Sequence, residues 1–412
     1  MKILLVNKYH YMRGGSETYY FGLAKLLKQQ GHQVIFFAME DEKNLPCEQA
    51  EYFVSHVEFN GELSVMDKLK AAGRMIYSFE AKKKMLALID KEKPDIVHIN
   101  LFHRVLTAAV IDAAKMRGLP VVFTMHDLNA ICPNHTMLDH GAICEACLGG
   151  NYFNCVKRVC FKDSRAKCLM AALESTYNKI SGMYRKIDMV ITPSDFYKEK
   201  LLASGLVSCP VVRMRNFLPA ETVYTRSPRG DYVLYFGRLS YEKGILTLVK
   251  AMKNINAPLV IVGTGPEEAA IREEAKRVGI ENRVLFMGFQ QGKDLTDLIR
   301  DAGVVVVPSE WYEASGYTAC EAAALGKIVV AADAGGLPEN LIDGMTGYVY
   351  PMGDVEALAA AIKRVRQLPP SLYQSMADMA IDNAKAAFDP TSYVKTLLMY
   401  YSDLIKQKGN GR

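Results

Sequence analysis

Glu313 and Glu321 are the residues of this chain whose type and spacing most clearly suggest chemistry. The apolar run 304–307 and the turn pair Pro308-Ser309 precede them, and small residues follow. This order predicts a buried strand, a polar loop that holds Glu313, and a helix that holds Glu321 one turn after its start. Open α/β sheets bind ligands at the carboxyl edge of their strands. We therefore expect both carboxylates to accept hydrogen bonds from different hydroxyls of one elongated polyhydroxy ligand.

A second loop in the same half offers cationic groups that suit a diphosphate. Arg238 and Lys243 lie between Gly237 and Gly244, directly after an apolar run. Arginine presents a planar fork to phosphate oxygens, whereas lysine presents a movable point charge. The alternative is a surface salt-bridge pair at a turn.

Backbone N–H groups at two helix starts could bind an anion nearby. Gly263 and Gly265 form a turn between a predicted strand and a predicted helix, and Gly316, Tyr317 and Thr318 open the helix that holds the second glutamate. Free N–H groups and the positive end of the helix dipole favour anions at such places. A plain strand-to-helix turn explains the Gly263 loop equally well. All three loops follow strands of one predicted sheet and should open on the same edge.

Two loops of the first half carry further candidates. Gly14 and Gly15 precede a predicted helix, for which Ser16 is a plausible N-cap, and they let backbone approach a ligand closely. His126 and Asp127 end a predicted strand. A lone histidine at such a place is more often structural than catalytic.

Composition limits the class of protein. The chain has 412 residues, of which 50% are hydrophobic and 23% charged, with a net charge of +5. This length predicts two or three domains, and the small net charge argues against nucleic acid as a partner. No apolar run reaches the roughly 18 residues of a membrane-spanning helix, and residues 1–7 resemble a strand rather than a signal peptide. We expect a cytoplasmic protein.

Short apolar runs alternate with longer amphipathic segments in both halves, which predicts α/β architecture with parallel sheets. We expect two Rossmann-like, doubly wound parallel-sheet domains that face a central cleft. The domains should span residues 1–215 and 216–389, because Pro and Gly interrupt the periodicity near the boundary. Residues 390–412 should hold a C-terminal helix, for which packing back on the first domain is one option. The helices expected in the first half are Glu17–Gln30, one within Met66–Lys91, Val105–Met116 and Ser164–Arg185.

An insert near residues 132–168 concentrates six of the nine cysteines. A Cys-x-x-Cys pair with further thiols nearby is typical of a structural zinc site, which would hold a long loop without a core of its own. An iron–sulfur cluster, reduced thiols without metal and reversible disulfides are alternatives that the spacing leaves open. The candidate zinc ligands are Cys132, Cys144, Cys147, Cys155, Cys160 and Cys168.

The second half resembles the nucleotide-binding domain of family 4 of the retaining glycosyltransferases, which have the GT-B fold. The ordered set of motifs is more specific than any one of them. It consists of Gly237-Arg238-Leu239, Glu242-Lys243-Gly244, Gly263-x-Gly265, Glu313-x7-Glu321, Gly335-Gly336 with Glu339, and Gly344 with Gly347.

The resemblance implies catalytic roles for four residues. Arg238 and Lys243 would hold the diphosphate of a nucleotide-sugar donor. Glu313 would contact the donor sugar, and Glu321 would bind the ribose hydroxyls. His126 would lie beside the donor sugar as a positioning and transition-state group.

The resemblance also implies a set of donor contacts. Gly14 and Gly15 would lie against the donor phosphate and the acceptor, Phe289 would border the base, and the backbone around Gly316 would touch sugar and phosphate. The full implied set is Gly14, Gly15, Gly237, Gly263, Gly265, Phe289, Ser315, Gly316, Tyr317, Thr318 and Glu321.

The implied function is transfer of a hexose from a UDP- or GDP-sugar to an acceptor hydroxyl with retention of configuration, in cell-surface polysaccharide or glycan biosynthesis. No Asp-x-Asp motif follows a predicted strand, so we expect catalysis without a metal. Two alternatives stay open. One is an inactive nucleotide-sugar-binding scaffold whose Cys-rich loop docks a partner, and the other is another GT-B activity such as a sugar-nucleotide epimerase.

The acceptor implied by the resemblance is a glycan or a lipid-linked molecule. The helix expected within Met66–Lys91 alternates lysines and arginines with apolar residues, as helices that bind anionic membrane surfaces do. Peripheral contact with the inner face of the membrane is therefore one expectation, and a solvated helix face is the other.

Overall fold

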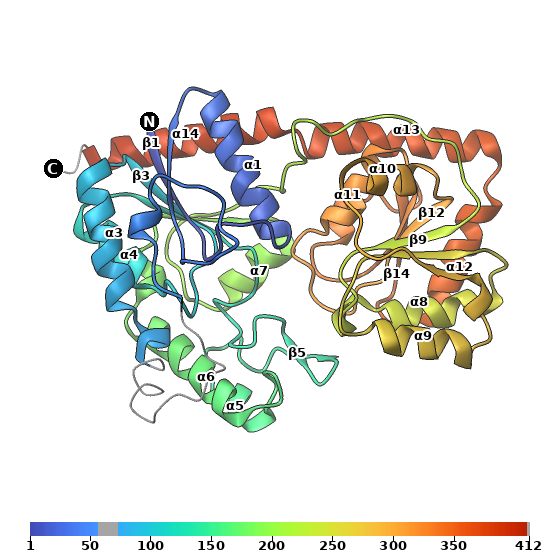
Figure 1. The fold of residues 1–412 in the computed structure, drawn as a ribbon, viewed down its shortest axis with the longest axis horizontal. Coiled ribbons are helices and arrows are strands. Elements are labelled where there is room, and N and C mark those ends of the chain that lie inside the picture. The colour runs from blue at the N-terminus through green and yellow to red at the C-terminus, as the bar shows by residue number, and fades with distance from the viewer. Residues whose placement is uncertain (57–72, 410–412) are drawn as a thin grey trace. The chain divides into compact units, whose positions relative to one another are not determined.

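The computed structural model describes residues 1–56 and 73–409. It forms two compact units, the first made of Met1–Met214 with Pro390–Arg412 and the second of Arg215–Asp389 (Figure 1). The boundary lies one residue before the expected one. The C-terminal helix α14 (Pro390–Gly409) belongs to the first unit and contacts helix α1 (Gly15–Gln29). The beginning of the basic segment expected within Met66–Lys91 lies outside the described residues.

The first unit is built on a six-stranded parallel sheet with the order β2-β1-β3-β4-β7-β8. Its central strands β3, β4 and β7 consist of fully buried residues, mostly Val, Ile and Phe, as expected of parallel strands covered on both faces. The strands are β1 (Lys2–Val6), β2 (Gln33–Phe37), β3 (Ile96–Ile99), β4 (Val121–Thr124), β7 (Met189–Thr192) and β8 (Val211–Arg213). The short hairpin of β5 (Leu138–Asp139) and β6 (Ala142–Ile143) lies in the insert.

Most helices of the first unit lie where the sequence placed them, with shifted ends. Helix α4 begins at Ala109 and not at Val105, because Arg104 and Thr107 have positive φ angles of 70° and 57° that a helix excludes. Helix α6 begins at Arg165, capped by Ser164, and ends at Ile180. The remaining helices are α3 (Phe79–Glu92), α5 (Asn154–Arg158) and α7 (Asp195–Ala203).

The second unit repeats the plan with the strand order β11-β10-β9-β12-β13-β14, again all parallel. The predicted α/β class with two parallel sheets is thereby confirmed. The strands are β9 (Val233–Phe236), β10 (Leu259–Val262), β11 (Val284–Phe286), β12 (Val304–Val307), β13 (Val329–Ala332) and β14 (Gly347–Tyr350). The helices are α8 (Ile245–Ala251), α9 (Glu268–Arg277), α10 (Gly292–Arg300), α11 (Tyr317–Ala324), α12 (Val355–Gln367) and α13 (Pro370–Ala387).

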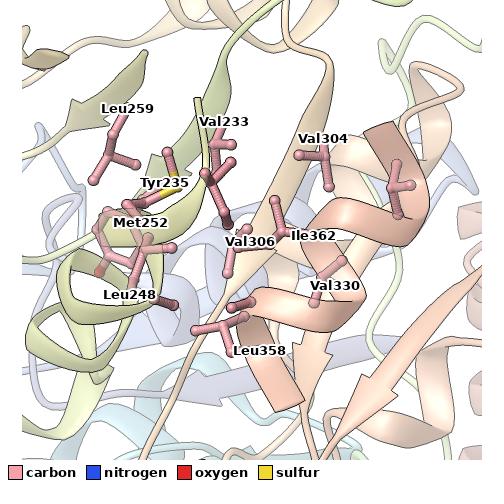
Figure 2. Packing of buried hydrophobic residues seen from close by; sticks show 14 of the residues in the cluster. Val233, Tyr235, Leu248, Met252, Leu259, Val304, Val306, Val330, Leu358 and Ile362 are labelled. Carbon is pink, nitrogen blue, oxygen red and sulfur yellow. The ribbon is translucent and has the colours of Figure 1, made fainter. Parts of the chain in front are cut away.

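Alternate residues of the central strands in the second unit point to opposite faces, and each face has its own core. On one face Val233, Val304 and Val306 pack with Leu248 of α8 and Ile362 of α12 (Figure 2). The other face packs against α10 and α11. Because β9 pairs with β10 on one side and β12 on the other, the loops after these three strands emerge side by side at one carboxyl edge. Those loops carry the Arg238, Gly263 and Glu313 motifs.

Candidate active site

The carboxyl edge of the second unit brings Lys243 and Glu313 together. Lys243 Nζ lies 2.6 Å from Glu313 Oε1, and Ser309 Oγ donates to the same oxygen at 2.6 Å. Trp311 provides one wall, with its ring centroid 5.0 Å from Lys243 Nζ. Glu313 lies in the loop before α11, as expected, and a single β-bridge to Gly335 fixes its backbone. The loop before α11 therefore holds the Lys243–Glu313 ion pair in a fixed position.

The carboxylate of Glu313 is ionised in this setting. Burial alone would raise its pKa, but the charge and hydrogen bond of Lys243 and the hydroxyl of Ser309 outweigh that effect and lower the pKa below its usual value. One carboxylate oxygen, Oε1, accepts both of these hydrogen bonds. Glu313 is thus suited to accept a hydrogen bond and not to donate a proton.

Glu321 lies on α11, five residues into the helix, and behaves differently from Glu313. Burial raises its pKa to about 7. A neutral carboxyl and a carboxylate therefore coexist near pH 7. Donor hydroxyls of a ligand would favour the ionised form.

Two neighbouring glycine loops of this edge pack backbone against backbone. A Cβ atom at Gly263 would lie 1.8 Å from the carbonyl oxygen of Gly237, and one at Gly265 would lie 2.1 Å from that of Leu239. Hydrogen bonds from Leu239 N to Thr264 O (3.0 Å) and from Glu267 N to Leu239 O (3.0 Å) lock the two loops. Packing of the two loops therefore requires glycine at these positions, whether or not they also contact a ligand. Arg238 projects from this rigid pair of loops and is exposed.

The start of α11 supplies the third part of the edge. Gly316 is its N-cap with φ of 74°, and a Cβ there would lie 2.5 Å from Leu337 Cδ1. Asn340 donates to the carbonyl oxygen of Ser315, whose own buried hydroxyl has no hydrogen-bond partner among the described residues. Such an unpaired hydroxyl is a natural contact for a polar ligand. Tyr317 and Thr318 are the first two helical residues, so their N–H groups lie at the helix start.

Phe289, expected beside the base, follows β11 at the end of the sheet. Its side chain is 67% exposed. An exposed ring at the edge of a polar site offers a flat surface on which a base could stack.

His126 follows β4 in the first unit and is held in one tautomer. Its Nε2 lies 2.8 Å from Asn100 Oδ1, and because a carbonyl oxygen only accepts, Nε2 carries the proton and Nδ1 keeps a lone pair. Burial lowers the pKa of His126 to about 3, so the ring is neutral at pH 7. The Tyr19 ring packs edge-on against it at 4.7 Å between centroids.

Helix α14 supports His126 indirectly, through Tyr19. Tyr393 and Tyr19 share a hydrogen bond of 2.6 Å between hydroxyls, and Tyr401 bonds to Nδ1 of the buried His98. The other ring nitrogen of His98 bonds Thr124 Oγ1 at 2.7 Å, at the end of β4. The sequence reasoning missed Asn100, Tyr19 and Tyr393, because their partners lie far away in the chain and no local motif marks them.

The glycine loop after β1 departs from one expectation. The N-cap of α1 is Gly14 and not Ser16, whose hydroxyl instead donates to the adjacent Glu17 carboxylate at 3.0 Å. The carbonyl of Gly14 accepts from the N–H groups of Glu17 and Thr18, so the loop is closed by backbone. Gly14 and Gly15 are both exposed and remain open to a ligand.

Asp127 belongs to a buried polar network that lies next to the insert. Its carboxylate accepts from the Asn129 backbone N–H at 2.9 Å. Arg104 donates to the carbonyl oxygen of Pro133 at 2.6 Å, and its backbone N–H donates to Glu174 at 2.7 Å. Asp127 therefore shapes the loop after His126.

The Cys-rich insert has a small core, contrary to the expectation that it lacks one. Cys147, Cys155 and Cys168 are buried together with Tyr152 and Phe161. Nine non-glycine residues of the described ranges have positive φ, and six of them lie between residues 135 and 163, so tertiary contacts must hold this backbone in place. The thiols of the insert serve here as packing groups.

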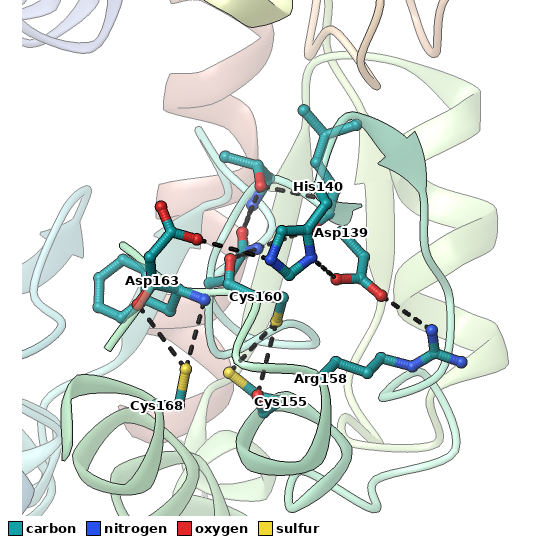
Figure 3. Close-up of polar contacts among 11 residues, drawn as sticks. Asp139, His140, Cys155, Arg158, Cys160, Asp163 and Cys168 are labelled. Atoms are coloured by element: carbon teal, nitrogen blue, oxygen red, sulfur yellow. Dashed lines mark hydrogen bonds and ion pairs between the residues drawn. The ribbon is translucent and has the colours of Figure 1, made fainter. Parts of the chain in front are cut away.

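The closest sulfur pair is Cys155 and Cys160, with 3.4 Å between Sγ atoms (Figure 3). Cys168 instead accepts from the Phe161 backbone N–H at 3.3 Å. Burial raises the pKa of Cys132 to about 11 and that of Cys147 to about 12, which keeps those thiols protonated. Within residues 1–56 and 73–409, no three His, Cys, Asp or Glu side chains come together in a way that could hold a metal ion. The six-cysteine zinc site therefore stays a prediction.

Comparison with known proteins places the chain in a family. Residues 13–221 match the model for Glycosyltransferase Family 4, and residues 223–386 match the model for Glycosyl transferases group 1. The chain belongs to the glycosyltransferases. This glycosyltransferase is 39% identical to an uncharacterized glycosyltransferase of Methanocaldococcus jannaschii over 138 residues, 32% of the chain and 35% of the relative.

A second relative is lipopolysaccharide 1,2-N-acetylglucosaminetransferase of Salmonella typhimurium, 32% identical over 189 residues, 39% of the chain and 48% of the relative. The chain thus matches less than half the length of either relative. Among solved structures, Anabaena HepE in complex with UDP-glucose superposes with a TM-score of 0.68 at 20% identity, over 98% of this chain and 100% of that one. The fold of this glycosyltransferase is GT-B. No helix of the described ranges combines the length and apolarity needed to cross a membrane.

Proposed function

We propose that this glycosyltransferase moves a hexose from a UDP- or GDP-sugar to an acceptor hydroxyl with retention of anomeric configuration. The observation that carries the proposal is the Lys243–Glu313 ion pair, which lies beside the start of α11 and the Arg238 loop. One edge then offers positive charge for a diphosphate and acceptor oxygens for sugar hydroxyls. The Salmonella relative acts in lipopolysaccharide synthesis, which supports an acceptor that is a cell-surface glycan.

The chemistry follows from where charge develops. As the bond between the anomeric carbon and the diphosphate oxygen breaks, the sugar becomes positive and the leaving group becomes more negative. Arg238, Lys243 and the N–H groups at the start of α11 would stabilise the leaving diphosphate more in the transition state than before it. Glu313 would orient the sugar and Glu321 the ribose. These groups can perform the task that a divalent metal performs elsewhere, so we propose catalysis without one.

Retention requires the acceptor to bond on the face that the diphosphate leaves. The acceptor hydroxyl would attack the anomeric carbon there, and its proton would pass to the departing phosphate oxygen. The neutral ring of His126 suits this step, because an imidazolium would oppose the developing positive charge whereas the Nδ1 lone pair can accept from a sugar hydroxyl. His126 is therefore proposed to position the sugar.

A panel of UDP- and GDP-sugars tests the proposal, with binding measured by thermal stabilisation and products identified with and without acceptor glycans. We expect one donor to stabilise the protein and to give an α-linked product from an α-linked donor, also in the presence of EDTA. Inverted product would refute retention, and loss of transfer with EDTA would refute metal independence. Conversion of the donor without any acceptor would indicate an epimerase. Binding without any conversion would indicate a scaffold.

Two smaller proposals accompany this function. The first is a structural zinc in the Cys-rich insert, tested by metal analysis of protein purified without chelator. One zinc per chain would support it, and metal-free protein with nine reactive thiols after denaturation would refute it. The second is peripheral contact with the inner membrane face, tested by sedimentation with vesicles that contain anionic lipid. Equal sedimentation with neutral vesicles or none at all would refute it.

A further inference from the structure

The carboxyl edge of the first unit carries a group of cations that the proposed reaction does not use. Lys8 follows β1, Arg104 follows β3, and Lys162 belongs to the insert that follows β4. These three strands are neighbours in the sheet, so their loops emerge side by side, and His126 emerges with them. The cations therefore lie on the edge that also holds the candidate sugar-positioning residue.

Aromatic rings hold these cations in pairs. Arg104 and Lys162 share the Phe161 ring, with the guanidinium carbon 4.3 Å and Nζ 5.7 Å from its centroid. Lys8 and Arg13 share the Tyr9 ring at 5.0 Å and 4.4 Å. A ring face attracts cations without neutralising them. Each ring thus has two positively charged side chains beside it.

Burial raises the pKa of three acids near this edge. Glu174, the buried partner of Arg104, has its pKa raised to about 7 by burial, and burial also raises the pKa of Asp127. Glu17 faces Arg13 but is itself buried and bonded to Asn7. Lys8, Arg13 and Lys162 form no ion pair with any residue in the described ranges. These three cations thus lack an acidic ion-pair partner within those ranges.

The cations also act on one another. Partial burial, followed by the charges of Lys167, Arg104 and Lys8, lowers the pKa of Lys162. Like charges held together in a folded protein repel, and an anion between them removes that repulsion. Since Lys162 and Phe161 belong to the insert, the insert itself supplies part of the group.

We propose that Lys8, Arg104 and Lys162, on the rings of Tyr9 and Phe161, form a subsite for an anionic group of the acceptor, a phosphate or a carboxylate. The inference rests on the proposed transferase function and names a chemical feature of its second substrate. The proposed donor diphosphate is assigned to other residues, Arg238 and Lys243 of the second unit. The anionic group of the acceptor, bound to these cations, would then hold the acceptor hydroxyl near His126.

The test measures binding of inorganic pyrophosphate by calorimetry to protein already saturated with UDP, so that the nucleotide site is filled. The variant is Lys8→Ala with Lys162→Ala, two side chains outside the cores. The matched control is Lys83→Ala with Lys157→Ala, two exposed lysines of the same unit. We expect the first pair to weaken pyrophosphate binding by at least about tenfold, as the loss of charge-assisted bonds predicts, and the control pair to leave it unchanged.

Equal affinity of both double variants, or no binding to the UDP-saturated wild type at low salt, would overturn the subsite. A parallel titration with glucuronate distinguishes carboxylate from phosphate as the preferred group, by which of the two binds more tightly and loses affinity in the first variant only. If only GDP binds, GDP takes the place of UDP in this titration, and failure of both nucleotides to bind would instead refute the proposed function. With an active acceptor, the first variant should raise the acceptor KM and leave the donor KM unchanged.

Discussion

The two carboxyl edges of this glycosyltransferase are built by different means. In the second unit, glycine loops pack backbone on backbone, and the ion pair of Lys243 and Glu313 joins residues of neighbouring loops. In the first unit, side chains far apart in sequence hold His126: Asn100 from the adjacent strand end, and Tyr19 backed by Tyr393 of α14. One edge is charged and rigid through its backbone, and the other is neutral at its centre and rigid through packed side chains.

This difference shows how each edge suits its proposed task. Stabilising a leaving diphosphate requires fixed charges and N–H groups, which a close-packed backbone positions well. Positioning a sugar requires a neutral acceptor group of defined tautomer, which a hydrogen-bonded side chain supplies. Substitutions should therefore act through charge and backbone crowding in the second unit, and through lost hydrogen bonds in the first.

The largest effect should come from Lys243→Ala. The variant loses the charge proposed to stabilise the leaving group and leaves Glu313 without its partner. We expect kcat/KM for transfer to fall about 100- to 1,000-fold, as when one transition-state donor is removed. The control is Lys250→Ala, an exposed lysine on α8. Transfer within a fewfold of the wild type would contradict the role given to Lys243.

Gly265→Ala should be next and should act on stability. Its Cβ would lie 2.1 Å from the Leu239 carbonyl oxygen, and φ at this position is not in the left-handed region, so crowding alone is tested. We expect the free energy of unfolding to fall by about 1–3 kcal/mol, measured by urea denaturation. Gly149→Ala, where a Cβ has nothing within 4 Å, is the control. Equal midpoints would show that the two loops can move apart.

Glu321→Gln removes the ionisable carboxyl group at the same edge while keeping a side chain of nearly the same size and shape. Burial raises the folded-state pKa of Glu321 from 4.5 to about 7. Stability from this group is thus full below pH 4.5 and lost as pH rises through 7, so the free wild-type protein should lose stability over that range. The proposed ribose contact favours the ionised form, so the affinity for UDP should rise roughly tenfold from pH 6 to pH 8. The Gln variant should lack this rise of UDP affinity with pH. The same dependence of UDP affinity on pH in the wild type and the variant would contradict the proposed ribose contact.

Asn100→Ala tests the first unit through its hydrogen bond to His126. With the tautomer no longer fixed, we expect transfer to fall about tenfold at unchanged donor KM. Asn100→Asp keeps an acceptor but adds a charge that favours the imidazolium. The wild type should show no imidazole titration between pH 5 and pH 8, because burial lowers the pKa of His126 to about 3. The Asp variant should lose rate at the acid end, and identical pH profiles would argue against this positioning.

The sequence predicted the edge of the second unit better than that of the first, for a physical reason. Arg238, Gly263 and Glu313 belong to motifs in which the turn and the functional group are neighbours in the chain, so local spacing reveals both. Asn100 and Tyr19 contact His126 from other strands and helices, and no local sequence motif identifies them. The Ser16 cap was wrong because the Gly14 carbonyl already closes the helix start. The core of the insert was missed because its cysteines suggested ligands rather than packing.

The smallest effect should come from Tyr401→Phe on α14. It removes one hydrogen bond to His98 while keeping the ring in place. We expect a loss of about 1 kcal/mol in the free energy of unfolding and little change in transfer. Leu372→Ala, at an exposed position of α13, is the control. A large loss of transfer in the Tyr401 variant would mean that α14 takes a direct part in catalysis.

Helix α14 also has a consequence for how the protein is made. The first unit includes Pro390–Arg412, so the whole of the second unit is synthesised before the last helix of the first becomes available. At the ~5–20 residues per second of translation, roughly 10 to 30 seconds separate the two parts. During that interval Tyr19 and His98 lack their partners Tyr393 and Tyr401. A nascent chain stalled in this window would present an unfinished first unit to chaperones, whereas the second unit could already be folded.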